Sequence, residues 1–351
     1  MSIEHHTSNL PNEIIEIILL HLPIKSLLRF KSVSKSWNSI ISDPVFTHTH
    51  LQFSNSPHLF LIKNRSFQGA FSLLKLEAKK FHREAVLSGP YGWNTVLCHC
   101  NGVLLLTDSY FKPTCYALWN PSTRTETYFT FRYTFYEDMN YGICYDPAIH
   151  DFKVVFAAGK NYAVFCCKTD TWTRRVGFPF KGTHSGVFAD GAYYWVWRDK
   201  EDVRHVVYFD SRIDKLKRLQ KPKQLTDEDH VSVACLKDSL CLYCNALGDE
   251  TKVRFWIKEK GSSFKNCWNE FSVIENVQTS IWSFRPLCFL EDKIVIRLES
   301  ARFLIYSLCD NTFEEFVDDE LCFVDLDPYK NSLFFTNLNA VSRRRRVIVI
   351  D

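Results

Sequence analysis

The stretch LPNEIIEIILLHLP, residues 10–23, is more apolar than a surface helix needs to be. Seven of the nine residues at positions 14–22 are Ile or Leu, whereas one face of an amphipathic helix requires about half of them. Pro11 fits the first helical turn, and Pro23 ends the helix because its ring and missing N–H do not permit continuation. We therefore expect this helix to bury one side in its own module and another side elsewhere.

Further short helices are predicted directly after it. One covers residues 24–30, a second covers residues 32–41, and Asp43-Pro44 opens a last turn that carries Val45 and Phe46. A module of this size lies near the lower limit for folding alone. The module has no net charge, because four basic residues are balanced by four acidic ones: Lys25, Arg29, Lys31 and Lys35 against Glu4, Glu13, Glu16 and Asp43. Any surface that it offers to a partner is therefore expected to bind through apolar contacts. Periodicity alone leaves open a helical cap that packs only on the rest of the chain.

The pattern LPxEIIxxILxxLPxKSLLRFKxVSKxW over residues 10–37 resembles the F-box. The resemblance implies docking on the SKP-type adaptor of a cullin–RING ubiquitin ligase, while the downstream domain captures the protein to be ubiquitinated. Trp37 is expected to anchor the internal packing of the module. The adaptor-facing positions that the resemblance implies are Leu10, Pro11, Ile14, Leu22, Pro23, Leu27, Leu28 and Val33.

The composition of the whole chain limits its fold class, its partners and its cellular compartment. The 351 residues are 46% hydrophobic and 15% aromatic, and 29 Phe favour strands over helices. A net charge of +3 does not indicate a nucleic-acid partner. Residues 1–6 carry no signal-peptide pattern, and no run of eighteen apolar residues indicates a membrane span. We expect the thirteen cysteines to be free thiols in a reducing compartment, the cytoplasm or nucleus.

From residue 52 onward the apolar period changes from 3.6 to 2, and short strands recur between turns every 40 to 50 residues or so, the period of propeller blades. We predict an F-box helical module over residues 1–51 and a six- or seven-bladed β-propeller-like domain over residues 52–351, with a β-sandwich pair as the alternative. The run at residues 347–350 is expected to pair with an early strand and close the ring. The predicted tight turns are Asn101-Gly102, Asp146-Pro147, Asp190-Gly191, Lys237-Asp238, Glu291-Asp292 and Asp327-Pro328.

This second region resembles the F-box-associated domain of the large plant F-box family, which is related in architecture to kelch propellers. The residues that carry the resemblance are CNGVLL (100–105), WNPSTR (119–124), YGICYDP (141–147), DFKVV (151–155) and GVFADGAYYW (186–195). The chain lacks the Gly-Gly doublets of strict kelch repeats and the Trp-Asp dipeptide of WD40 blades.

No pattern of catalytic chemistry stands out. The sequence has neither G-x-G-x-x-G nor a P-loop, G-x-S-x-G or H-E-x-x-H motif, so we expect no cofactor, no metal and no catalytic residue. Cys241-x-x-Cys244 lies in a strand pattern where positions three apart face opposite sides, and Cys98-His99-Cys100 is interpreted as strand core. His48-x-His50 is expected at the surface. The Arg343–Arg346 run is interpreted as a solvated loop that an acidic run at residues 314–327 could neutralise, with a nuclear-localisation or nucleic-acid role as the alternative.

The sequence thus predicts a non-catalytic substrate receptor of an SCF-type (SKP–cullin–F-box) ubiquitin ligase. Its partners would be the SKP-type adaptor, the cullin and RING subunits bound through it, and an unknown protein substrate, with no nucleic acid and no membrane. The alternatives are an adaptor-binding scaffold that acts outside a cullin complex, and a propeller enzyme with a helical cap. Aromatic and Arg side chains dominate interface hot spots, so the candidate substrate-binding residues are Tyr91, Trp93, Tyr110, Phe111, Trp197, Arg198 and Trp282.

Overall fold

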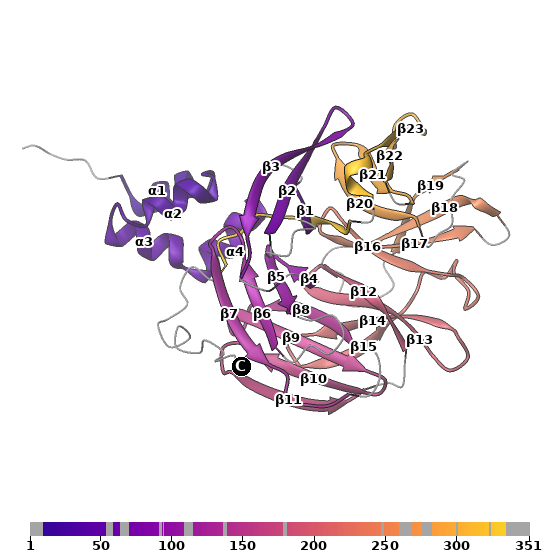
Figure 1. The fold of residues 1–351 in the computed structure, drawn as a ribbon, viewed down its shortest axis with the longest axis horizontal. Coiled ribbons are helices and arrows are strands. Elements are labelled where there is room, and N and C mark those ends of the chain that lie inside the picture. Colours follow the sequence, from indigo (N-terminus) through magenta and orange to yellow (C-terminus); the bar gives the residue numbers. More distant parts are fainter. Residues whose placement is uncertain are drawn as a thin grey trace, which may run out of the picture.

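The chain forms a helical module followed by a ring of six four-stranded sheets (Figure 1). The structure is a computed structural model. It describes residues 10–53, 59–63, 70–90, 93, 95–108, 115–135, 139–177, 181–246, 249–259, 268–275, 283–299, 301–322 and 324–334.

Four helices make up the N-terminal module: α1 (Asn12–Leu20), α2 (Ile24–Phe30), α3 (Lys35–Ser42) and α4 (Pro44–Phe53). Pro11, which was expected in the first helical turn, stands at the N-cap of α1. Pro23, which was expected to end the first helix, stands at the N-cap of α2, and α1 already ends at Leu20. The Ser34 hydroxyl accepts a hydrogen bond from the Trp37 amide at 3.0 Å and so starts α3. The prediction of a single last turn after Asp43 was wrong, because α4 continues for ten residues. Its Val, Thr and His residues have modest helix propensity, and packing stabilises it instead.

The core of the module combines all four helices with one residue from the far end of the chain. Phe30 and Trp37 meet edge to face with ring centroids 5.3 Å apart, so Trp37 has the internal packing role that was expected. The fully or almost fully buried members of this cluster are Leu19, Ile24, Leu27, Ile41, Phe46 and Leu333.

Each blade of the propeller is a four-stranded antiparallel sheet. Six innermost strands surround the axis, and the order of each sheet confirms a six-bladed propeller and excludes the β-sandwich. From the innermost strand outward, blade one is β24 (Leu326–Tyr329), β1 (Leu59–Lys63), β2 (Ala70–Glu77) and β3 (Lys80–Ser88), and blade two is β4 (Thr95–Cys100), β5 (Val103–Thr107), β6 (Cys115–Asn120) and β7 (Thr125–Thr130).

In the same order, blade three is β8 (Asn140–Asp146), β9 (Asp151–Ala158), β10 (Asn161–Cys166) and β11 (Thr171–Val176), and blade four is β12 (Lys181–Ala189), β13 (Ala192–Arg198), β14 (Arg204–Asp210) and β15 (Lys215–Leu219).

Blade five is β16 (Ser232–Leu236), β17 (Ser239–Ala246), β18 (Asp249–Lys258) and β19 (Trp268–Ile274), and blade six is β20 (Arg285–Leu290), β21 (Lys293–Arg297), β22 (Arg302–Ser307) and β23 (Thr312–Val317), which is followed by a short 3₁₀ helix at Asp319–Leu321.

Five of the six predicted tight turns connect the innermost strand of a blade to its second strand, in blades two to six. Asn101 and Gly102 both have positive φ, at 50° and 76°, as a type I′ hairpin turn requires. The sixth prediction was wrong, because Asp327-Pro328 lies within β24, where Pro328 pairs with Phe60 of β1. Pro328 is tolerated there because β24 is an edge strand of its sheet.

The ring closes through β24, which adds a C-terminal strand to a sheet whose other three strands come from the start of the propeller. A late strand that pairs with an early one was expected, but the expected segment was residues 347–350, which lie outside the described residues. Because this closure joins residues 59–62 to 326–329, the sheet edge that each segment would otherwise expose is covered.

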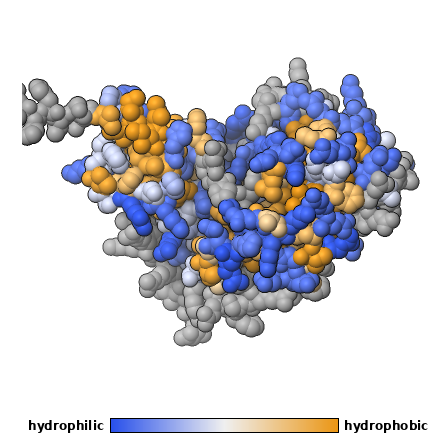
Figure 2. All heavy atoms as spheres, turned by 90° about the horizontal axis from the view of Figure 1, so that it is seen from above, coloured by the Kyte–Doolittle hydropathy of each residue, from blue (hydrophilic) through white to orange (hydrophobic). Residues whose placement is uncertain are grey.

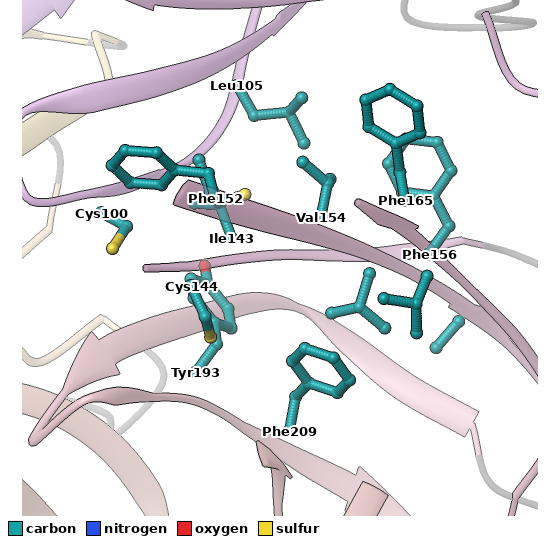
Figure 3. Packing of buried hydrophobic residues seen from close by; sticks show 14 of the residues in the cluster. Cys100, Leu105, Ile143, Cys144, Phe152, Val154, Phe156, Phe165, Tyr193 and Phe209 are labelled. Carbon is teal, nitrogen blue, oxygen red and sulfur yellow. The ribbon is translucent and has the colours of Figure 1, made fainter. Parts of the chain in front are cut away.

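Aromatic side chains and cysteines fill the space between blades, and the largest cluster joins blades two, three and four (Figure 3). The twelve cysteines that the structure describes are free thiols. Burial raises the pKa of the Cys144 thiol well above its usual range, so this thiol behaves as a small apolar group. Cys241 and Cys244 point to different clusters on opposite faces of β17. Among the described residues, no helix is long and apolar enough to span a bilayer.

Candidate functional site

An exposed apolar face lies on the helical module, and Figure 2 shows it as an orange area at the end of the molecule away from the propeller. We call it the exposed apolar face and define it by five side chains on α1 and its flanks and in the turn after α2. Their exposed fractions are 57% for Leu10, 43% for Ile14, 54% for Ile17, 47% for Ile18 and 61% for Val33.

The helical module also exposes charged side chains. Glu13 and Glu16 of α1, Lys25 and Arg29 of α2 and Lys35 of α3 are all exposed. An apolar centre with a polar rim is the usual anatomy of a protein–protein interface. The propeller leaves this face uncovered. Within the described chain, α1 therefore buries the side that faces its own module, and the second side that was expected to be buried elsewhere stays exposed.

The structure divides the predicted adaptor-facing residues into three groups. Leu10, Pro11, Ile14, Pro23 and Val33 are exposed, and Leu22 and Leu28 are half-buried against the module core. Leu27 has no exposed surface and belongs to the module's own core, so the structure does not offer it for docking. Its neighbours in this core come from the other helices of the module and from Leu333.

Ile17 and Ile18 are exposed apolar residues that were missing from the predicted adaptor-facing set. The signal that could have found them was present, because an all-round apolar helix has more apolar side chains than its own core can cover. The surplus on α1 is therefore real, and these two residues extend the exposed apolar face along the helix.

The two histidines of α4 differ from the prediction of a surface pair. His48 is half-buried and stacks on Tyr145 of the propeller, with ring centroids 6.2 Å apart. His50 is 2% exposed, and its Nε2 lies 2.9 Å from the Leu22 carbonyl oxygen. Burial lowers the pKa of His50, although the hydrogen bond to Leu22 offsets part of this effect. Both residues are structural, and they connect α4 to the module on one side and to the propeller on the other.

A central cavity of about 2480 Å³ is lined by all six innermost strands, and α4 contributes His48, Leu51 and Gln52 to its wall. The wall is polar on one side, where Arg285 pairs with Asp327 and His99 is near. Burial raises the pKa of Asp327, but the Arg285 guanidinium reverses this and holds the pKa below its usual value. The opposite wall, from β12 and β16, is apolar and includes Phe188, Val233 and Ala234.

The predicted substrate-binding residues do not form one surface among the described residues. Trp93 is 9% exposed and packs on Tyr128 at 5.4 Å, and Trp197 is 2% exposed in the core between blades. The structure therefore places both in the interior, as is common where aromatic residues are this frequent. Arg198 is partly exposed and pairs with Asp202 at 3.2 Å. Tyr91, Tyr110, Phe111 and Trp282 lie outside the described residues.

The remaining candidates for chemistry give no site among the described residues. In the described part of the chain, no three His, Cys, Asp or Glu side chains are grouped as metal ligands would be. Two residues of the acidic run at residues 314–327 form ion pairs with other basic residues, Glu314 with Lys79 and Glu315 with Arg302. Arg343–Arg346 lies outside the described residues.

Comparison with known proteins agrees with this architecture. Residues 73–321 match the family model of the F-box associated beta propeller domain, and residues 7–49 match the F-box domain. The chain is an F-box protein of the F-box-associated propeller family. Its module of four helices is thus the F-box, and its six blades are the associated propeller.

Relatives of this F-box protein include three from Arabidopsis thaliana with similar coverage. An F-box/kelch-repeat protein is 25% identical over 86% of this chain and 88% of its own length. A probable F-box protein is 23% identical over 88% of this chain and 76% of its own length. The F-box protein CPR1 is 25% identical over 83% of this chain and 80% of its own length. The similarity therefore extends over both the F-box and the propeller.

Proposed function

We propose that this F-box protein is a substrate-recognition subunit of an SCF-type ubiquitin ligase. The F-box binds an SKP-type adaptor, which connects it to the cullin and RING subunits, and the propeller binds a protein substrate. Membership in the F-box family supports this role in general terms. The single observation that carries the adaptor assignment is the exposed apolar face, which the chain's own propeller leaves open.

The contribution to ubiquitin transfer is proximity. The F-box and the propeller are joined through α4, whose Leu51 packs against the propeller core while Phe46 belongs to the F-box core. A substrate held on the propeller is then kept at a high local concentration near the ubiquitin-loaded enzyme, and a bimolecular transfer becomes effectively intramolecular. Families of F-box and propeller domains are typically non-enzymatic adaptors, and a binding role needs no catalytic side chain.

Co-purification tests this proposal directly. The full chain, expressed with an SKP-type adaptor, should form a one-to-one complex, and replacing Ile14 and Ile18 by Asp should abolish it because two charges would enter an apolar interface. The circular dichroism of the propeller strands should be unchanged. A variant that still co-purifies with the adaptor in equal amount would contradict the assignment of this face.

A scaffold role outside a cullin complex is the alternative that differs in partners. It predicts adaptor binding without recruitment of a cullin, so the same pull-down, probed for the cullin, separates the two. We also propose that the chain works in the cytoplasm or nucleus, which fluorescence microscopy of a tagged chain can check.

A further inference from the structure

The chain continues beyond its last strand and passes between the F-box and blade two. Residues 330–334, which we call the strap, leave β24 and carry Leu333 into the core of the F-box. The next residue, Phe334, packs against Tyr145 at 4.7 Å and Phe152 at 5.3 Å in the core of the propeller. Leu333 is 1% exposed and Phe334 is 5% exposed, so the strap joins the two cores.

Asn120 holds the strap to the propeller. This side chain is fully buried at the end of β6, and its Nδ2 donates to the Ser332 carbonyl at 3.2 Å, the Ser332 Oγ at 3.0 Å and the Phe334 carbonyl at 2.8 Å. Its Oδ1 accepts from the Ser122 amide at 2.9 Å. Both halves of the amide are therefore satisfied, the oxygen by the turn and the nitrogen by the strap.

The rest of the same turn adds contacts to the strap. Ser122 Oγ donates to Asn331 Oδ1 at 2.9 Å, and Thr123 Oγ1 donates to the Phe334 carbonyl at 3.3 Å. On the other side, a Cβ added at Gly102 would lie 2.3 Å from the Lys330 carbonyl oxygen. The strap thus lies in a fitted position, between the turn at residues 120–125 and the hairpin at Gly102.

The equivalent turns in blades three and four show which contacts of Asn120 belong to the turn itself and which serve only the strap. In blade four, Asp210 Oδ1 accepts from the Arg212 amide at 3.2 Å, as Asn120 does for Ser122, but a carboxylate has no hydrogen to donate. In blade three, Thr169 and Thr171 hydroxyls lie 2.6 Å apart, as Thr123 and Thr125 do in blade two. The acceptor half of Asn120 therefore builds the turn, and its donor half is free to bind the strap.

We propose that the turn of residues 120–125, which overlaps the WNPSTR segment (119–124), is an intramolecular docking site for the strap, and that the docked strap fixes the orientation of the F-box on the propeller. Asn120 is then a positioning residue, because it acts on the F-box through Ser332 and Leu333. The consequence for ubiquitin transfer rests on the proposed function, whereas the docking itself does not.

Hydrogen exchange of the full chain tests the docking. Asn120→Asp keeps the acceptor that forms the turn but removes the three donor contacts, so amides in the strap and in α4 should exchange at least tenfold faster, while the strands of blades four and five are unchanged. Thr123→Ala should act in the same direction more weakly. Thr169→Ala, the matched change in blade three, should leave the strap unaffected.

A second set of variants keeps the test decisive if Asn120→Asp does not fold. Ser122→Ala and Leu333→Ser remove contacts of the strap outside the amide, and both should raise exchange in the strap and in α4. Unchanged exchange in these variants and in Thr123→Ala would overturn the proposal, as would exchange that rises equally in all six blades.

Ubiquitin transfer gives a readout that stability alone would not move. In a ligase reconstituted with adaptor, cullin and RING subunits, transfer to lysines of the propeller itself can be mapped by mass spectrometry. We expect few modified lysines in the wild type and a broader set in Asn120→Asp, with unchanged adaptor affinity. An identical lysine pattern would contradict fixed orientation, whereas loss of adaptor binding in the wild type would refute the proposed function and leave the exchange result standing.

Discussion

Three isoleucines on the exposed apolar face permit a quantitative prediction. The change is Ile14→Ser, Ile17→Ser and Ile18→Ser together, made in the full chain. Ser and Ile have similar helix propensity, and all three side chains are about half exposed, so the F-box should remain folded.

The expected loss follows from the surface that these residues still expose. Complete burial of an Ile side chain is worth about 1.5–3 kcal/mol. With 43%, 54% and 47% of the three side chains exposed, docking can bury roughly half of each, or about 1 kcal/mol per residue. The sum of about 3 kcal/mol corresponds to an increase of roughly 150-fold in the dissociation constant for the adaptor.

Titration calorimetry with purified SKP-type adaptor measures this change. Val176→Ser is the matched control, since Val176 is 71% exposed on β11, an outer strand of the propeller, and its loss should leave the affinity unaltered. A triple variant that binds within threefold of the wild type while its thermal unfolding is unchanged would refute the docking assignment.

Three further predictions concern stability. Leu27→Ala should destabilise the F-box by about 2–5 kcal/mol, seen as an early transition in chemical denaturation, because a fully buried side chain leaves a cavity. His50 is buried with its pKa lowered, so the unfolded chain binds more protons near the ordinary His pKa of about 6.5. F-box stability should therefore be fully present above that pH and fall as the pH drops below it, and His50→Gln should remove this dependence in pH-resolved melting. Lys153 is 2.9 Å from Asp146 and 2.8 Å from Asp214 between blades three and four. Asp214 keeps Arg175 as a second partner, but Lys153→Met leaves the buried Asp146 carboxylate without a counter-charge and should cost about 3–5 kcal/mol. Adding Asp146→Asn should recover part of the loss in thermal unfolding.

The sequence predicted the repeating parts of the fold because their signals are local. Hairpin turns such as Asn101-Gly102 require positive φ, and the strands between them alternate with period 2. The all-round apolar pattern of α1 likewise predicted a face that its own module does not cover, and the structure leaves Ile17 and Ile18 exposed there.

Features that depend on contacts between distant segments could not be predicted in this way. The strand β24 has only four residues, two of which are Asp327 and Pro328, and it is a strand because β1 supplies its partner. Leu27 was in the adaptor-facing set that the resemblance implies, and its burial among the other helices and Leu333 has no local signal in the sequence. The role of Asn120 depends on the strap, which lies more than 200 residues away in the chain.

The measurement that tests the central claim most directly is the mass of the assembly. The full chain is mixed with SKP-type adaptor, cullin and RING subunits, and the complex is separated by size exclusion and weighed by light scattering. We predict one particle with one copy of each of the four components, which the triple Ile variant fails to form. A particle of chain and adaptor that excludes the cullin, or a chain that elutes alone, would contradict the account.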